Sequence, residues 1–214
     1  MREIQYNWKY SKAFQPVFDF KGRYIALTGG RASGKSWFLA HYFLDLLLYK
    51  KADLLCARKF QNSITESNYK LFKNIINKYD LPYEIQSTRI KSRTTGSQIV
   101  FIGLSDVTAD NVKSFEDFKF VWLEEAQKIS KKSWETLNPT IRTENAQIFI
   151  LFISEYSYIT SKNSYPIEMQ LFIRNRSVVF RNGINRKPLR GSFGWCIPFS
   201  PSSRLRRQLG ATRP

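Results

Sequence analysis

Short apolar runs alternate along this chain with segments whose apolar residues recur at helical intervals. Four runs are predicted to be buried strands, at residues 24–28, 53–57, 118–123 and 147–153. Two more strands, 83–90 and 98–104, are expected around a hairpin turn at 94–97. Strands that alternate with helices, several of them apolar on both faces, predict a three-layer α/β domain with a mostly parallel central sheet.

Three helices are predicted among these strands. Residues 37–49 are apolar and contain neither Gly nor Pro, which is typical of a buried helix. Ser63 and Glu66 have the spacing of a capping box, so the next helix is expected to begin there and to end at Leu81-Pro82. A short helix is expected around 133–137, with the Asn-Pro that follows as its stop.

Charge adds a second kind of information. The 214 residues carry 34 Lys and Arg against 17 Asp and Glu, a formal net charge of +17. A balance of that size favours a polyanionic partner, most simply nucleic acid, although a solubilising surface would have the same composition. The only two cysteines, Cys56 and Cys196, are too few for a metal site or a disulfide framework, and Cys56 is predicted to be a buried thiol.

Composition also divides the chain into three parts. Residues 1–23 form an aromatic and basic lead-in that is expected to pack over the nucleotide-side edge of the sheet, residues 24–154 form the folded core, and residues 155–214 form an irregular basic tail. The tail holds 11 Lys and Arg against 2 Asp and Glu. The chain begins with a mixed polar stretch and has no apolar run of membrane-spanning length, so neither secretion nor membrane insertion is expected.

The segment from Gly29 to Ser36 reads G-x-x-x-x-G-K-S, the spacing of a phosphate-binding loop. Its glycines let the backbone curl so that N–H groups point at phosphate oxygens, and the helix that follows adds its dipole. Lys35 is predicted to reach the β- and γ-phosphates of ATP, and the Ser36 hydroxyl to bind Mg²⁺. The loop residues predicted to contact nucleotide are Gly29, Gly30, Arg31, Ala32, Ser33, Gly34, Lys35 and Ser36. The alternative is a chance match in a turn.

An acidic pair, Glu124-Glu125, follows the predicted strand 118–123. Because the carboxyl ends of parallel strands face the ligand crevice, Glu124 is expected to organise Mg²⁺, directly or through water. Glu125 is expected to act as the catalytic base or to position the attacking water. A solvated acidic pair at the start of a helix is the alternative, and the phosphate loop upstream favours the catalytic interpretation.

Three arginines are candidates for contact with the transferred phosphoryl group or for coupling. Arg31 lies inside the loop, where a guanidinium can stabilise the charge that develops on the γ-phosphate. Arg58 follows the second strand and Arg142 follows the short helix, and either could contact nucleotide, a neighbouring subunit or DNA, or form a surface ion pair. His41 lies on an apolar helix face and is predicted to be a core histidine.

These motifs together resemble the large terminase subunits of tailed bacteriophages, over about residues 20–153. The resemblance lies in the loop with its following Trp37, in Leu55-Cys56-Ala57-Arg58-Lys59-Phe60-Gln61-Asn62-Ser63-Ile64, in Val121-Trp122-Leu123-Glu124-Glu125-Ala126, and in Ser133-Trp134-Glu135 with Pro139-Thr140-Ile141-Arg142. Their order and spacing agree with the family.

The resemblance implies a P-loop ATPase of the catalytic-glutamate branch that drives double-stranded DNA into a procapsid, in the cytoplasm of a bacterial host. It also implies a homo-oligomeric ring at the portal protein, a small terminase subunit as partner, and ATP with Mg²⁺ as cofactors. The loop arginine of the family is a proposed catalytic residue, which supports that role for Arg31. Glu124 stands where many relatives have Asp.

Two departures from the family accompany the resemblance. Relatives carry an Asn-Pro coupling motif directly after the strand equivalent to 147–153, whereas this chain continues Ser154-Glu155-Tyr156. Relatives also continue into a metal-dependent nuclease domain, and Glu155 and Glu168 are the only acids in the last sixty residues, so nuclease activity is not expected. These departures suggest a truncated or frame-disrupted gene. The alternatives are another nucleic-acid-dependent ATPase, such as a helicase-like motor, or a terminase remnant that binds nucleotide without turnover.

Overall fold

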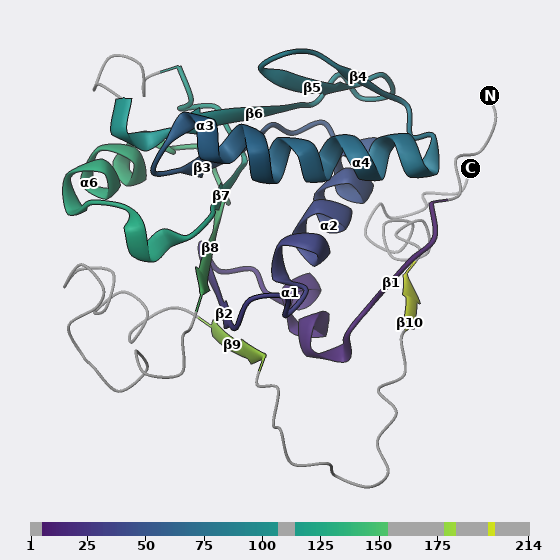
Figure 1. Cartoon of the computed structure of the whole chain (residues 1–214), viewed down its shortest axis with the longest axis horizontal. Coiled ribbons are helices and arrows are strands. Elements are labelled where there is room, and N and C mark those ends of the chain that lie inside the picture. The colour runs from purple at the N-terminus through teal and green to yellow at the C-terminus, as the bar shows by residue number, and fades with distance from the viewer. Residues whose placement is uncertain (1–5, 107–113, 154–177, 183–196, 200–214) are drawn as a thin grey trace, which may run out of the picture.

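The structure, a computed structural model, describes residues 6–106, 114–153, 178–182 and 197–199 (Figure 1). Eight strands form one sheet in the order β4-β5-β6-β3-β7-β8-β2-β9. Their bounds are β2 Tyr24–Gly29, β3 Leu54–Arg58, β4 Tyr83–Ile85, β5 Arg89–Ser92, β6 Gln98–Gly103, β7 Phe120–Leu123, β8 Gln147–Ile153 and β9 Val178–Asn182. In this order, the six neighbouring strands β6, β3, β7, β8, β2 and β9 are parallel, and β5 and β4 extend the sheet in antiparallel pairing. The predicted mostly parallel sheet is confirmed.

Helices cover both faces of this sheet, which makes three layers. One face carries α2 (Lys35–Tyr49) and α4 (Lys70–Tyr79), and the other carries α6 (Lys131–Thr140). In Figure 1, α2 and α6 lie on opposite sides of β7 and β8. Alternate residues of β7 enter different cores, with Phe120 and Trp122 on the α2 side and Val121 and Leu123 on the α6 side. Such strands are apolar throughout because helices bury both of their faces.

The helix expected from Ser63 begins earlier than the capping box predicts. Its N-cap is Phe60, and it runs through α3 (Gln61–Ile64) and a π-helical segment (Thr65–Tyr69) into α4. The Gln61 side chain accepts a hydrogen bond from the backbone N–H of Gly103 and donates one to the carbonyl of Phe101. These bonds to β6 attach the start of the helix to the sheet, and Ser63 therefore lies inside the helix rather than at its cap.

Two other boundaries differ from the sequence pattern. The predicted strand 83–90 is divided into β4 and β5 by a tight turn in which the Gln86 N–H donates to the Arg89 carbonyl at 2.9 Å. The short helix predicted at 133–137 extends over the whole of α6, with Ser130 as its N-cap and Pro139 inside its last turn. Pro139 therefore does not stop the helix, which continues for one more residue.

The lead-in contains β1 (Trp8–Tyr10), the short 3₁₀ turn Lys12–Phe14 and α1 (Gln15–Asp19). Its aromatic side chains pack on α2, where the Phe14 ring stacks on Phe38 at a centroid distance of 4.2 Å, and the 3₁₀ turn lies beside β9, the edge strand of the sheet. β1 pairs with β10 (Ile197–Phe199). Two short strands, β9 and β10, therefore fall within the predicted tail, and most of that tail, with Glu155, Glu168 and Cys196, lies outside the described residues.

Cys56 is buried in β3, as predicted. No helix in the described ranges combines the length and apolar character needed to cross a membrane.

Candidate nucleotide-binding site

The predicted phosphate loop connects the end of β2 to the start of α2. Gly34 is the N-cap of α2 and has φ = 81°, a left-handed conformation that glycine adopts without strain. Its carbonyl accepts the first helical hydrogen bond, from the Phe38 N–H at 2.8 Å. Ala32 also has a positive φ, of 58°. The loop therefore curls over the helix N-terminus, where backbone N–H groups and the helix dipole favour an anion.

The Lys35 ammonium lies inside this loop. It donates to the carbonyls of Gly29 and Gly30 at 2.8 and 3.1 Å and to the Ser33 hydroxyl at 2.8 Å. Burial lowers the pKa of Lys35, and the Glu124 carboxylate opposes that shift. The ammonium is therefore held by oxygen atoms of the loop, at the place where phosphate oxygens are expected to replace them.

Glu124 and Ser36 bring two oxygen groups together beside the loop. The Ser36 hydroxyl donates to Glu124 Oε1 at 3.0 Å, and the Trp122 indole donates to Oε2 at 2.8 Å. Burial raises the pKa of Glu124, while these two hydrogen bonds and the nearby Arg58 lower it in part. A hydroxyl and a carboxylate are the hard oxygen ligands that Mg²⁺ takes alongside water and substrate phosphates, so this pair fits the predicted metal. The described residues contain no cluster of three or more His, Cys, Asp or Glu that would suit another ion.

Glu125 follows Glu124 and points to different partners. Its backbone is left-handed, with φ = 49° and ψ = 50°, an uncommon conformation for a non-glycine residue that redirects its side chain. Its carboxylate forms ion pairs with Arg58 and with Lys128, the latter at 2.6 Å. Burial raises the pKa of Glu125, but the hydrogen bonds and charges of these two cations outweigh burial, and the net shift is downward. The carboxylate is therefore ionised at neutral pH.

Strand order explains why these groups meet. β3 and β7 are parallel neighbours, with Ala57 opposite Leu123, and the Glu124 N–H donates to the Ala57 carbonyl at 2.9 Å. Arg58 therefore leaves β3 beside the acidic pair that leaves β7. β8 separates β7 from β2, and Ser36, in the first turn of α2, spans this gap with its hydrogen bond to Glu124.

The other candidates lie apart from this cluster. Arg31 is exposed in the loop, and its guanidinium makes no hydrogen bond or ion pair within the part of the chain that the structure describes. Arg142 follows α6 near the amino ends of the strands, where its Nε donates to the Pro139 carbonyl, so it lies at the end of the sheet away from the loop. His41 is fully buried, and its Nδ1 shares a hydrogen bond with the Tyr6 hydroxyl, as expected for a core histidine.

Two residues of the cluster were missed in the sequence. Trp122 precedes Glu124 by two positions on a strand, so their side chains share a face, and this spacing could have identified it. Lys128 follows Glu125 by three positions in the 3₁₀ turn Ala126–Lys128, which brings its ammonium back to the carboxylate. Both residues hold a carboxylate in place. Trp122 lies within the segment 121–126 that carries the family resemblance, but no role is predicted for it or for Lys128 from the sequence.

Comparisons with known proteins give matches in both sequence and fold. A family model described as "Phage terminase large subunit" matches residues 21–158. The PBSX phage terminase large subunit of Bacillus subtilis (strain 168) is 24% identical over 138 residues, which cover 63% of this chain and 31% of that protein.

Solved structures show the same fold. The large terminase of a thermophilic bacteriophage has a TM-score of 0.61 at 13% identity, over 80% of this chain and 45% of that chain. The same thermophilic phage protein in complex with ADP gives 0.58 at 9% identity, with the same coverage. The N-terminal domain of the DNA packaging ATPase from bacteriophage phi29 gives 0.51 at 16%, over 72% and 86%. This chain thus spans about a third of the PBSX protein and under half of the thermophilic phage terminase.

Proposed function

Because this chain belongs to the phage terminase large subunit family, we propose that it is the ATPase domain of a DNA-packaging motor. The observation that carries the proposal is the contact between Ser36 and Glu124 at 3.0 Å, beside a loop that encloses the Lys35 ammonium. A helix N-terminus, a buried cation and an oxygen pair meet there, and each is a group that nucleoside triphosphate binding requires. The thermophilic phage terminases that were solved with ADP and with ATP-γ-S support nucleotide binding by the same fold.

The loop residues 29–36 bind the triphosphate in this mechanism. Backbone N–H groups of the loop donate to phosphate oxygens, and Lys35 exchanges its contacts with Gly29, Gly30 and Ser33 for the β- and γ-phosphates. Ser36 and Glu124 hold Mg²⁺, which supplies charge neutralisation at the phosphates when it is bound. The Trp122 hydrogen bond keeps the Glu124 carboxylate oriented toward Ser36.

Glu125 orients the attacking water in this proposal. Its lowered pKa keeps it ionised, so it accepts a hydrogen bond from water and polarises it for in-line attack on the γ-phosphate. Arg58 and Lys128 hold the carboxylate until nucleotide binds. Arg31, exposed at the loop, stabilises the charge that develops on the phosphoryl oxygens. Arg58 is the better placed of the two coupling candidates, because Arg142 lies away from the site.

Double-stranded DNA is the proposed substrate of the motor. The net charge of +17 favours a polyanion, and the family's role in packaging supports duplex DNA as that polyanion. A homo-oligomeric ring, a portal protein and a small terminase subunit are the partners proposed for the intact system, in the host cytoplasm. Nuclease activity is not proposed for this chain.

Nucleotide binding and hydrolysis test the proposal together. Lys35→Ala is expected to abolish binding of a fluorescent ATP analogue, whereas Lys73→Ala, which removes an exposed charge on α4, is expected to leave binding unchanged. Duplex DNA is expected to stimulate steady-state hydrolysis more than single-stranded DNA or RNA. Stronger stimulation by single strands would favour a helicase-like motor, and binding without turnover would favour a remnant.

A further inference from the structure

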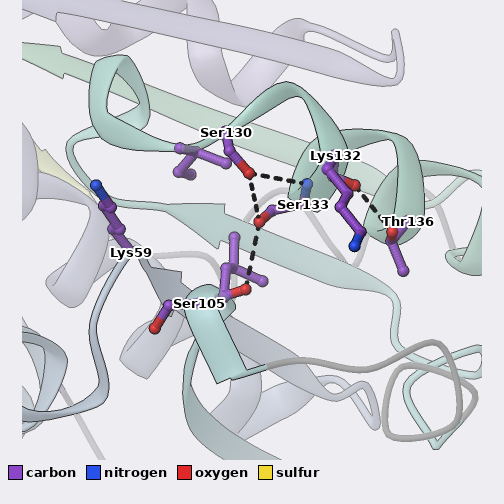
Figure 2. A pocket seen from close by; sticks show the side chains of 8 residues that line it. Lys59, Ser105, Ser130, Lys132, Ser133 and Thr136 are labelled. Carbon is purple, nitrogen blue, oxygen red and sulfur yellow. Dashed lines mark hydrogen bonds between the residues drawn. The ribbon is translucent and has the colours of Figure 1, made fainter.

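A polar cavity of about 230 Å³ lies on the α6 face of the sheet (Figure 2). It is bounded by the residue that follows Arg58, by the 3₁₀ turn Leu104–Asp106 and by the start of α6. The lining residues are Lys59, Leu104, Ser105, Ile129, Ser130, Lys132, Ser133 and Thr136. None of them belongs to the phosphate loop or to the acidic pair, so the cavity is separate from the nucleotide site.

Its lining has the chemistry of an anion site. Two ammonium groups and four hydroxyls contribute to it, and none of the eight residues is acidic. Figure 2 shows Lys59 and Lys132 on opposite sides, with Ser105, Ser130 and Ser133 between them. Neither lysine forms an ion pair with any carboxylate in the described ranges, and the Lys59 ammonium lies over the neighbouring Phe60 ring, at 4.9 Å. Among the described residues, therefore, no carboxylate competes with a ligand for either positive charge.

The start of α6 adds to this field. Ser130 caps the helix by accepting from the Ser133 N–H at 3.2 Å, and the hydroxyls of these two serines are 2.9 Å apart. The Ser133 hydroxyl in turn contacts the Leu104 carbonyl at 3.3 Å, which joins the helix to the opposite wall. The positive end of the α6 dipole thus faces a cavity whose walls are fixed by hydrogen bonds. The lysines, which are not part of this network, supply the ligand contacts.

Size and composition select the ligand. The cavity is smaller than the roughly 300–1,000 Å³ typical of sites for whole small molecules, so a single phosphate group fits it better than a nucleotide does. No aromatic residue lines the cavity, so none of the lining side chains can stack on a base. Contacts of this kind hold a nucleic-acid backbone without reading its sequence. We propose that Lys59 and Lys132 bind a backbone phosphate of duplex DNA in this cavity, an inference that rests on the proposed motor function.

The cavity also lies next to the residues that hold Glu125. Lys59 directly follows Arg58, and its carbonyl accepts from the Ser105 N–H at 2.9 Å. On the other wall, Ile129 and Ser130 directly follow the 3₁₀ turn Ala126–Lys128. In the first hydrogen bond of this turn, the Lys128 N–H donates to the Glu125 carbonyl at 2.9 Å. A phosphate bound between Lys59 and Lys132 therefore touches the two segments whose neighbouring residues form the Arg58–Glu125 ion pair. DNA bound here is expected to raise ATP turnover.

Binding of a labelled short duplex, followed by fluorescence anisotropy over a range of salt concentrations, tests the site. The double variant Lys59→Ala/Lys132→Ala is compared with Lys73→Ala/Lys91→Ala, which removes the same charge from exposed positions on α4 and β5. The cavity variant is expected to bind roughly tenfold more weakly, with the slope of log affinity against log salt reduced by about two, one for each lysine that no longer neutralises phosphate charge. Lys59→Arg/Lys132→Arg is expected to retain most of the affinity.

Three results would overturn the site. An equal loss of affinity in both double variants would mean that DNA senses only total charge. Unchanged duplex affinity in Lys132→Ala, an exposed change that does not threaten folding, would exclude that lysine. If the cavity substitutions weakened the binding of inorganic phosphate but left duplex affinity unchanged, the ligand of the cavity would be free phosphate. Binding of an ATP analogue by every variant is measured in parallel, because its loss in the unsubstituted chain would contradict the motor proposal instead.

Discussion

Asp45→Asn is expected to change how the stability of this protein depends on pH. Asp45 lies on α2 one turn after His41, and its side chain is almost completely buried. Its Oδ2 accepts from the Trp8 indole at 3.4 Å, whereas Oδ1 has no partner among the described residues. Burial raises the pKa of Asp45 from 3.8 to about 7, with the Trp8 hydrogen bond acting in the opposite direction. Ionised Asp45 is thus unfavourable in the folded state.

The sign of the effect follows from this shift. The folded state binds the Asp45 proton more tightly than the unfolded state, so the contribution is full below pH 3.8 and is lost as pH rises toward 7. A rise from 3.8 to about 7 corresponds to roughly 4 kcal/mol lost above pH 7. His41 acts in the opposite direction, because burial, with a smaller effect of Lys78, lowers its pKa from 6.5 to about 4. Its contribution is lost as pH falls through this window and amounts to roughly 3 kcal/mol.

These two slopes nearly cancel in the unsubstituted protein between pH 4 and pH 6.5. Asp45→Asn removes only the Asp45 slope, so the stability of the variant relative to that of the unsubstituted protein is expected to rise by roughly 3 kcal/mol across that window. At pH 8 the variant is expected to be about 1–3 kcal/mol more stable, because the new amide leaves a buried N–H unpaired, which offsets part of the gain. Tyr42 and Tyr83 stay neutral throughout, since burial and then Asp45 raise the pKa of each.

Urea unfolding followed by tryptophan fluorescence at several pH values measures this difference. Asp80→Asn is the matched control, because Asp80 is exposed at the end of α4 and its substitution is expected to change stability by less than about 0.5 kcal/mol at every pH. A stability difference between Asp45→Asn and the unsubstituted protein that does not vary with pH would refute the reasoning. So would a stability advantage of the variant over the unsubstituted protein that is smaller at pH 8 than at pH 5.

Three further substitutions follow from contacts of the fold and site. Gly103→Ala is expected to destabilise the protein by about 3 kcal/mol or more, because a Cβ there would lie 2.4 Å from the Gln61 backbone nitrogen. Gly30→Ala is the control in thermal unfolding and should be near neutral, because a Cβ at Gly30 meets nothing within 4 Å. Trp122→Phe removes a donor to buried Glu124 and is expected to cost about 1–3 kcal/mol in urea unfolding; a neutral result would mean that water replaces the indole. Ser130→Ala removes the α6 cap and is expected to cost about 1 kcal/mol, and an unchanged melting temperature would contradict the capping geometry.

The strands and the phosphate loop could be predicted because their signals are local. An apolar run such as 147–153 is buried on both faces wherever it sits in the sheet, and the spacing from Gly29 to Ser36 is contained in eight residues. The acidic pair was likewise placed correctly at the carboxyl end of its strand. These features depend on neighbours in the chain, which the sequence displays directly.

Features that depend on strand order could not be predicted in the same way. The ion pair between Arg58 and Glu125 requires β3 to lie beside β7, although 67 positions separate the two residues in the chain. The helix begins at Gln61 because that side chain binds the backbone of β6, a contact that outweighs the capping-box spacing. The roles of the site residues, and the division at 23 and 154, stay predictions.

The most direct measurement compares ATP affinity and ATP turnover in Glu125→Gln. If Glu125 orients the attacking water and other groups bind the nucleotide, affinity should remain close to that of the unsubstituted protein while turnover falls by about 10²–10⁴-fold. Glu84→Gln, at an exposed position on the edge strand β4, serves as the control and should leave both quantities unchanged. Turnover that persists in Glu125→Gln would contradict the proposal that this carboxylate, held by Arg58 and Lys128, serves ATP hydrolysis.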